Sequence, residues 1–289
     1  MSPSPSRIPL GIACVMGGIF SLTVSDTLAK WLGHIYSPMQ IVFLRGGIAT
    51  LALLILAGQL GGRQALLTSH LGVHLLRGAL NVLTAYCFYL SLTFLPQAEA
   101  TAIAFSAPFF VTIISVIFLK EKVALAGWLA LLTGFAGVLL VVRPSPDHMQ
   151  WAALLPLLTA LGYAVMMTTA RYIKAQESML TMMLYLGVGQ AVFAGPLSAW
   201  IWVPVQAEHW LGFAGIAFFS TVGLGLITQA FRVAPASIVA PFDYSGLIWA
   251  TLFGWVIWHE VPSTWFYAGA LLIAGSGIYV ALFSGRNKT

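Results

Sequence analysis

Long apolar stretches alternate with short polar breaks along almost the whole chain. Most of the stretches hold about 20 residues, the length at which an α-helix crosses the roughly 30 Å hydrocarbon core of a bilayer. We predict ten membrane-spanning helices, at residues 8–32, 39–57, 71–94, 97–119, 124–142, 151–173, 179–202, 210–231, 235–258 and 264–283. The breaks contain prolines and charges, as at Ser37-Pro38 and Val261-Pro262. The pattern therefore predicts an all-α integral membrane protein.

The composition supports this interpretation and leaves no space for a further soluble domain. Of the 289 residues, 60% are hydrophobic and 7% are charged, whereas soluble domains contain about 25% charged residues. Two cysteines, Cys14 and Cys87, fall inside predicted spans and act there as small apolar residues. The composition thus excludes an ordinary soluble enzyme.

Cationic residues predict how the helices are oriented. If the N-terminus is cytoplasmic, ten of the thirteen Lys and Arg residues lie in cytoplasmic breaks or at cytoplasmic helix ends. These ten are Arg7, Arg63, Arg77, Lys120, Lys122, Arg171, Lys174, Arg232, Arg286 and Lys288. Lys30, Arg45 and Arg143 lie in the outer half. Under the positive-inside rule both termini are expected in the cytoplasm. The net charge of +5 therefore indicates topology, and we expect no nucleic-acid partner.

One stretch of the chain recurs. The segment from Pro96 to Glu121 is echoed 139 positions later by the segment from Pro235 to Glu260, and Ser106 and Ser245 keep the same offset. Each half holds five predicted spans, an odd number, so the second half starts on the opposite side of the membrane. The sequence thus predicts two inverted five-helix repeats, a design typical of secondary transporters.

The repeat sets the domain boundary and carries a resemblance to a known family. We place the first repeat at residues 1–146 and the second at 147–289. The first contains a proline, glutamate and glycine pattern made of Pro96, Pro108, Glu121, Gly127, Gly134 and Gly137. In this pattern the chain resembles the drug/metabolite transporter superfamily, and within it the EamA-type ten-helix exporters. Its aromatic content is most similar to that of YddG-like exporters of aromatic amino acids. The second repeat departs from the pattern, because Leu247 stands where Pro108 predicts a proline.

The resemblance implies a function and a location. It implies a secondary transporter that works by alternating access in the bacterial inner membrane and exports small metabolites, aromatic and other large neutral amino acids foremost. The alternative within the superfamily is a transporter of nucleotide-sugars or phosphorylated metabolites. Neither implies a cofactor or a metal, and the expected partners are a small-molecule substrate and membrane lipid. A monomer is the simplest expectation. His259-Glu260 lacks the second histidine of a His-Glu-x-x-His zinc motif, so we do not expect an enzyme.

Polar residues inside a membrane are costly and usually face the bundle interior. We expect a substrate pathway formed by Asn81, Thr84, Phe88, Ser106, Tyr163, Thr228, Asp243 and Tyr244. The third span supplies a stripe at steps of three or four residues, the spacing of one helical face. Hydrogen bonding between helices explains the same stripe equally well. Asp243 follows two prolines and is suited to an amine or a proton, or to an ion pair with Arg232 or Arg77.

A second group of charged residues is expected to gate or couple transport. It consists of Asp26, Lys30, Arg45, Arg77 and Glu99. Asp26 and Lys30 are four residues apart, which predicts a local ion pair on one helix. Arg77 lies near the cytoplasmic end of its span, as does His74, and we expect both to extend toward the membrane surface. Glu260, like its counterpart in the first repeat, is expected to cap or brace a helix end.

Overall fold

The structure is a computed structural model that describes residues 8–60, 67–119, 125–142, 151–173, 178–234 and 240–283. Within these ranges every regular element is helical and there is no strand. In chain order the elements are α1 (Ile8–Leu32), α2 (Pro38–Leu60), α3 (Leu71–Leu92), α4 (Gln97–Ala104), α5 (Ala107–Leu119), α6 (Leu125–Val142), η3 (Trp151–Ala153), α7 (Leu154–Ile173), α8 (Met179–Trp200), η4 (Ala207–His209), α9 (Trp210–Val233), η5 (Ala240–Tyr244), α11 (Ser245–Trp258) and α12 (Thr264–Phe283).

The helices occupy the stretches in which the sequence predicts them. In the described residues, six helical stretches are long and apolar enough to cross a membrane, and 127–142 and 151–166 are shorter apolar helices. The prediction of an all-α membrane protein is therefore confirmed. The number of ten crossings stays a prediction.

Two of the predicted spans are not continuous helices. α4 ends at Ala104, and the amide of Ser106 donates to the carbonyl of Ile103 at 3.0 Å in the turn before α5. Pro108 explains this break, because a proline has no backbone N–H and its ring clashes with the carbonyl four residues earlier in a continuous helix. In the span expected at 235–258, the tighter 3₁₀ helix η5 precedes α11. Residues 235–239 lie outside the described part.

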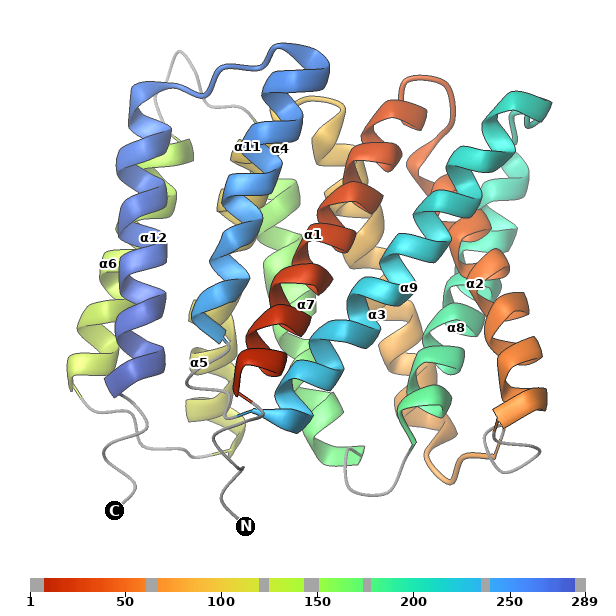
Figure 1. The fold of residues 1–289 in the computed structure, drawn as a ribbon, viewed down its shortest axis with the longest axis horizontal. Coiled ribbons are helices and arrows are strands. Elements are labelled where there is room, and N and C mark those ends of the chain that lie inside the picture. The colour runs from red at the N-terminus through yellow and green to blue at the C-terminus, as the bar shows by residue number, and fades with distance from the viewer. Residues whose placement is uncertain are drawn as a thin grey trace.

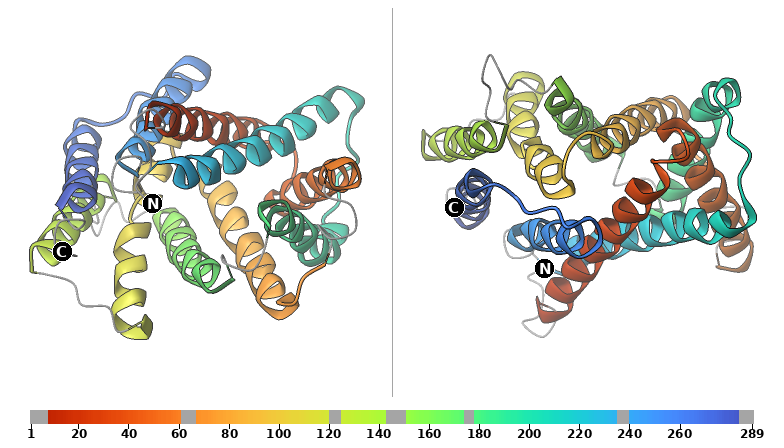
Figure 2. Two further views of the ribbon diagram at one scale, coloured as in Figure 1. Left: turned by 60° about the horizontal axis from the view of Figure 1, so that its bottom comes forward. Right: turned by 90° about the horizontal axis from the view of Figure 1, so that it is seen from above.

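The helices run side by side in one bundle (Figure 1). α1 begins and α12 ends at the same end of the bundle, which we call the terminal end; the other is the opposite end. α1 packs along α9, α2 along α8, α3 against both α7 and α8, and α6 along α12. The pair α6 and α12 stands at one edge of the molecule, as the view from above shows (Figure 2).

Glycines allow the closest helix contacts. A Cβ atom on Gly78 of α3 would lie 2.8 Å from the Cα of Gly189 on α8. Real Cβ atoms do not come this close to a neighbouring backbone atom. A Cβ on Gly137 of α6 would similarly lie 2.7 Å from the carbonyl oxygen of Gly269 on α12. Small residues are the usual means by which membrane helices approach closely. The first contact brings α8 against α3, and the second makes α6 and α12 a tight pair.

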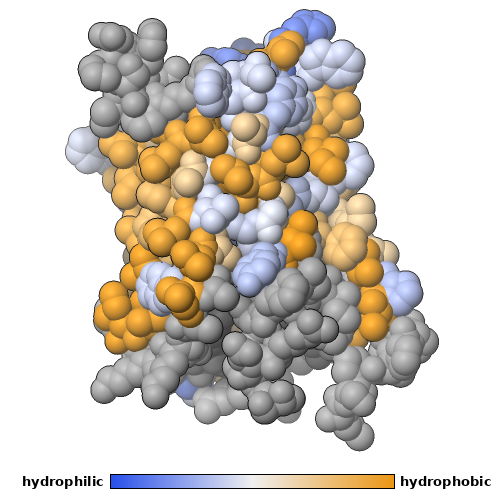
Figure 3. All heavy atoms as spheres, turned by 90° about the vertical axis from the view of Figure 1, so that its left-hand side faces the viewer, coloured by the Kyte–Doolittle hydropathy of each residue, from blue (hydrophilic) through white to orange (hydrophobic). Residues whose placement is uncertain are grey.

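The outer surface fits a bilayer. Hydrophobic side chains cover much of the face that carries α6 and α12, and hydrophilic ones gather toward its upper edge (Figure 3). Six tryptophans at or next to the opposite end are more than two-fifths exposed: Trp31, Trp151, Trp200, Trp202, Trp210 and Trp265. Tryptophan is enriched where a membrane protein meets the lipid headgroups. The opposite end therefore lies at a membrane–water interface.

Candidate functional site

Four helices, α2, α3, α8 and α9, enclose a small cavity that we call the midplane cavity. Its lining consists of Arg45, Ala49, Leu53, Asn81, Met183, Leu186, Gly187, Gln190, Ser220, Thr221 and Leu224. Asn81 and Gln190 each lie roughly 15 Å from both ends of their helices, at a rise of 1.5 Å per residue. That depth is the middle of a bilayer core of roughly 30 Å. Secondary transporters typically bind their substrates at this level.

Two amides close the midplane cavity. The side-chain amide of Gln190 on α8 donates to the side-chain oxygen of Asn81 on α3, and the Asn81 amide nitrogen lies 3.7 Å from the sulfur of Met166 on α7. The cavity volume is about 40 Å³, enough for a few water molecules but not for a metabolite. A substrate can enter only if these helices separate or the amide pair opens.

A charged group adjoins the cavity on the side of the opposite end. The guanidinium of Arg45 on α2 donates to the hydroxyl of Tyr89 on α3 at 2.7 Å, and lies 5.9 Å from the centre of that ring. The carboxylate of Asp26 on α1 interacts electrostatically with Arg45 and with Tyr89. The group places an acidic and a basic side chain beside a polar cavity. It can therefore bind a molecule that carries both a positive and a negative charge.

A second polar cluster, which we call the latch, lies closer to the opposite end. Lys30 on α1 forms an ion pair with Glu260, just beyond α11, and its ammonium lies 4.8 Å from the centre of the Trp258 ring. The second oxygen of Glu260 accepts from the backbone amide of Gln97, the first residue of α4, at 3.1 Å. The buried Gln97 side chain donates to the hydroxyl of Thr27 at 3.0 Å. The latch thus joins α1, α4 and α11.

The latch corrects one prediction and confirms another. Lys30 pairs with Glu260, 230 positions away, rather than with Asp26 one turn earlier on its own helix. The local ion pair was wrong because Asp26 interacts instead with Arg45. The expectation that Glu260 braces a helix end is confirmed by its bond to the first turn of α4. Its counterpart Glu121 lies outside the described residues.

The interruptions of the two broken helices carry polar atoms with unused bonding capacity. Among the described residues at or near these two interruptions, four buried atoms have no hydrogen-bond partner. They are the hydroxyls of Ser106 and Ser245, one carboxylate oxygen of Asp243, and the indole nitrogen of Trp249. The rings of Phe105 and Tyr244 meet with 5.2 Å between their centres, so the two interruptions face each other. Buried polar groups normally find partners. These atoms are therefore available to a ligand.

Tyr163 lies near this second polar region. It belongs to α7, interacts electrostatically with Asp243, and is 44% exposed. This interaction places Tyr163 near the broken helices, although much of its surface is accessible. The structure therefore brings Tyr163, Asp243, Tyr244 and Ser106 into one region; that they line a substrate pathway stays a prediction.

Other candidates make packing contacts. The hydroxyl of Thr84 donates to the carbonyl of Asn81, and its methyl group lies where a side chain on Gly162 of α7 would sit. Thr228 donates to the Leu224 carbonyl within α9. Phe88 is partly buried against the core. Glu99 lies in the first turn of α4, where a negative charge complements the helix dipole.

The side chains of Arg77 and His74 lie deeper than predicted. Arg77 is 4% exposed and His74 is 2% exposed, so neither side chain extends to the membrane surface. The His74 ring stacks on Tyr185 of α8 with 4.7 Å between centres, which explains why it stays inside. Two of the Arg77 guanidinium nitrogens have no hydrogen-bond partner in the described residues.

Sequence reasoning missed Gln190. It lies in the middle of an apolar stretch and is 4% exposed, yet it contributes both the amide bond to Asn81 and part of the cavity wall. A side-chain amide at the centre of a predicted span is itself a signal, because polar groups are costly there unless they serve an interaction.

Comparison with known proteins identifies a family whose members the chain resembles in sequence. The EamA-like transporter family matches the chain twice, over residues 9–143 and 150–283. A riboflavin transporter from Brucella anthropi is 31% identical over 242 residues, covering 79% of this chain and 83% of its own. The pseudopaline exporter CntI of Pseudomonas aeruginosa is 30% identical and covers 91% of this chain and 93% of its own.

Two further similarities extend over almost the whole chain. An S-adenosylmethionine uptake transporter from Rickettsia bellii is 27% identical, covering 97% of this chain and 96% of its own. A crystal structure of a protein that is 17% identical matches with a TM-score of 0.65, over 96% of this chain and 99% of that one. At that identity the likeness concerns the fold alone.

Proposed function

Because the chain belongs to the EamA-like transporter family and is thus a small-molecule transporter, we propose that it exports zwitterionic metabolites. Aromatic and other large neutral amino acids are the foremost candidates. The relatives described above are named as transporters of riboflavin, pseudopaline and S-adenosylmethionine. Those names extend the choice of substrates beyond amino acids, so the narrower likeness to YddG-like exporters stays part of the proposal.

The observation that carries the proposal is the pairing of opposite charges beside the midplane cavity. Arg45 lines the cavity and Asp26 interacts with it, so a substrate carboxylate has a cationic partner and a substrate ammonium an anionic one. Asn81 and Gln190 offer amide donors and acceptors beside them. Tyr89 and Tyr163 supply aromatic surface on which a ring or an ammonium can rest.

The charges do not favour a phosphorylated substrate. A phosphate group carries about two negative charges near neutral pH and normally requires several converging cations. Among the described residues that line the midplane cavity, Arg45 is the single cation. Arg77 is buried on the same helix as Asn81, but it does not line this cavity.

We also propose that the chain crosses the membrane ten times as two inverted repeats, with both termini in the cytoplasm. Three features support the symmetry. The family matches each half separately, and the turn at Phe105 and Ser106 lies 139 positions before Tyr244 and Ser245, where η5 gives way to α11. Exchanging each helix with its counterpart turns the α1–α9 contact into the α7–α3 contact, and both are present.

In this scheme the structure is a state closed toward the outside. The latch of Lys30, Glu260 and Gln97 joins three helices at the opposite end, which the topology makes the outer end. Opening that end requires the latch to break. Tyr163 and Asp243 then line the inner part of the route, and alternating access exposes the midplane cavity to each side in turn.

The test is counterflow in proteoliposomes that are loaded with one unlabelled amino acid and given the labelled form outside. We expect saturable exchange of phenylalanine, tryptophan or leucine, competed by one another and abolished in Asp26→Asn. Glu208→Gln is the matched control, since that carboxylate is 75% exposed at the opposite end. Exchange of a sugar phosphate without exchange of any amino acid would overturn the zwitterion proposal.

A further inference from the structure

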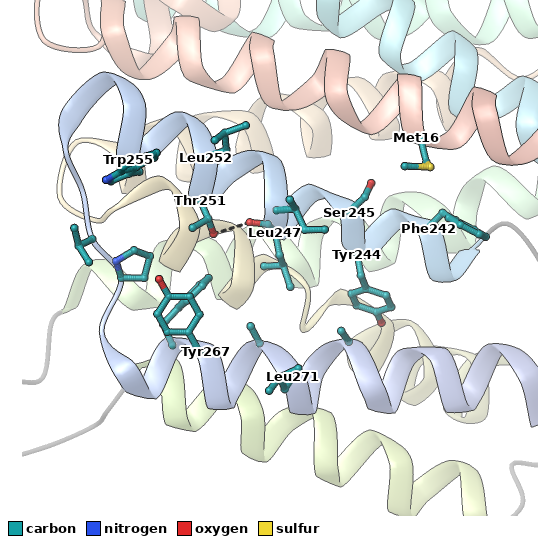
Figure 4. Close-up of a pocket in the computed structure, with 16 residues that line it drawn as sticks. Met16, Phe242, Tyr244, Ser245, Leu247, Thr251, Leu252, Trp255, Tyr267 and Leu271 are labelled. Carbon is teal, nitrogen blue, oxygen red and sulfur yellow. Dashed lines mark hydrogen bonds between the residues drawn. The ribbon is translucent and has the colours of Figure 1, made fainter.

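A wide groove separates α11 from α12 (Figure 4). Its volume is about 980 Å³, and none of the residues that line it is charged. Thr251, one of its few polar side chains, donates to the carbonyl of Leu247 within α11 at 2.7 Å and so has little left to offer a ligand. The groove is therefore suited to an apolar occupant.

The groove opens sideways from the bundle. Ile248 and Trp255 of α11 are 66% and 56% exposed, and Leu271 of α12 is 75% exposed, although all three line it. In the ten-crossing topology proposed above, both helices cross the membrane. The medium at this opening is therefore hydrocarbon and not water.

The groove is one leaflet deep. On α11 its lining runs from Ser245 to Trp255, ten residues or roughly 15 Å of helix. This is half of a bilayer core of roughly 30 Å. The lining continues to Val261 and Pro262, between α11 and α12, and on α12 it ends at Ala274, ten residues or roughly 15 Å into that helix. On the other side it extends past Ser245 to Phe242 of η5 and Met16 of α1. Along α12 the groove therefore begins at the opposite end and stops near the midplane.

Tyr244 closes the inner end of the groove. Its ring points from η5 toward α12 (Figure 4), and its hydroxyl occupies the place where a Cβ atom on Gly277 would lie. The absence of a side chain at Gly277 thus lets Tyr244 reach across the gap between the helices. The same tyrosine contacts Phe105 and follows Asp243, so the floor of the groove is part of the broken-helix region.

We propose that one acyl chain of a phospholipid, from the leaflet at the opposite end, occupies this groove and rests on Tyr244. A membrane helix from a second copy of this chain fits less well, because a spanning helix extends through both leaflets and the groove extends through one. The lipid chain fills the gap between α11 and the α6–α12 pair. It also supports the aromatic contact between the two broken helices.

A photoreactive phospholipid with a diazirine near the end of one acyl chain tests the proposal in proteoliposomes, and mass spectrometry maps the adducts. We expect labelling of groove residues such as Leu247 and Ala274 to exceed, several-fold, that of Leu51 and Ile55. The latter are 64% and 66% exposed on α2 and report random lipid contact. Equal labelling of both surfaces overturns the proposal, as does a dominant cross-link to a second protein chain.

Two variants narrow the groove. Ala270→Trp fills its middle, and the milder Ala274→Leu shortens it near Tyr244; both alanines line it. Each is expected to cut groove labelling several-fold and leave Leu51 labelling unchanged, provided that size-exclusion profiles match the wild type. Labelling that persists unchanged in a folded variant contradicts the site. No substrate is present, so this result is independent of the counterflow experiment.

Discussion

At the scale of single residues, the central fact is that Asp26, Lys30 and Arg45 have their partners on other helices. Arg45 joins α2 to Tyr89 on α3 and acts on Asp26 of α1. Isolated charges are costly at the centre of a membrane and persist when they are paired or functional. The pair of Asp26 and Arg45 beside a polar cavity meets both conditions: each group stabilises the other, and in the function we propose a zwitterion replaces those contacts.

Arg45→Gln removes the positive member of that pair. A hydrogen bond to a charged group contributes about 1.5–3 kcal/mol, so we expect the affinity for an amino-acid substrate to fall about ten- to hundredfold. Equilibrium binding of labelled phenylalanine in detergent measures the change directly. Tyr89→Phe is the matched variant, since it keeps the charge and deletes one bond; it should reduce affinity less. Equal affinity in Arg45→Gln and wild type would remove Arg45 from the substrate site.

The residues of this site differ in how readily they can be predicted from the sequence. Asp26 and Arg45 are recognisable because charges in apolar spans are rare. Their partners are not, since helical spacing reveals neighbours on one helix only. Lys30 illustrates the limit: its four-residue spacing from Asp26 predicts a local pair, whereas packing supplies Glu260 from the far end of the sequence.

At the scale of helices, the latch ties the start of α4 to α1 and α11. Lys30 is 4% exposed and Glu260 is 23% exposed. Glu260→Gln leaves the Lys30 ammonium buried without its counter-charge, which typically costs about 3–5 kcal/mol. We therefore expect a marked fall in melting temperature for Glu260→Gln. The double variant Lys30→Met with Glu260→Met should recover most of the loss.

Comparison of these two variants separates the contribution of the Lys30–Glu260 ion pair from that of the other contacts of Glu260. If the double variant is as unstable as Glu260→Gln, the loss comes from the bond between Glu260 and the first turn of α4, and the charge pair is secondary. If it recovers, the charge pair is what holds the opposite end closed, and opening that end should cost less free energy in the double variant. A cysteine at position 27 should then react faster with maleimide than the same cysteine in the wild-type background.

The α6–α12 pair depends on glycine. A Cβ on Gly269 would lie 2.5 Å from the Gly137 carbonyl oxygen, whereas a Cβ on Gly275 of the same helix meets nothing within 4 Å. Overpacking costs about 1–3 kcal/mol, so Gly269→Ala should lower the melting temperature. Gly275→Ala is the control and should leave it unchanged or raise it, because alanine favours helix by about 1 kcal/mol. Equal effects would contradict tight packing of these two helices.

Helix positions follow well from the apolar pattern because length and hydrophobicity are local properties. The breaks inside two spans are harder to place. Pro108 signals a disturbance, but the chain turns at Phe105 and Ser106, before the proline, since the ring disturbs the helix four residues earlier. Prolines therefore mark the two spans in which a break can occur, while the site of the turn and the meeting of Phe105 with Tyr244 depend on tertiary packing.

At the scale of the whole molecule, the first helices of the two proposed repeats run in opposite directions. α1 runs from the terminal end to the opposite end, and α7 runs the other way (Figure 1). An exchange of the two halves therefore converts a bundle closed at one end into one closed at the other. The latch at the opposite end and the small midplane cavity fit one member of such a pair of states. The function we propose requires the second.

The orientation of the bundle is open to direct measurement. In a background with Cys14→Ala and Cys87→Ala, one cysteine replaces Glu208, before α9 at the opposite end, and another replaces Ser69, before α3 at the terminal end. Both positions are exposed. In intact cells a membrane-impermeant maleimide should label position 208 and reach position 69 only after permeabilisation, because the positive-inside rule places the lysine-rich and arginine-rich side in the cytoplasm. The reverse pattern would invert the transporter and make the latch an inner gate. Labelling of both positions in intact cells would contradict an odd number of crossings between residues 69 and 208, and with it the inverted repeat.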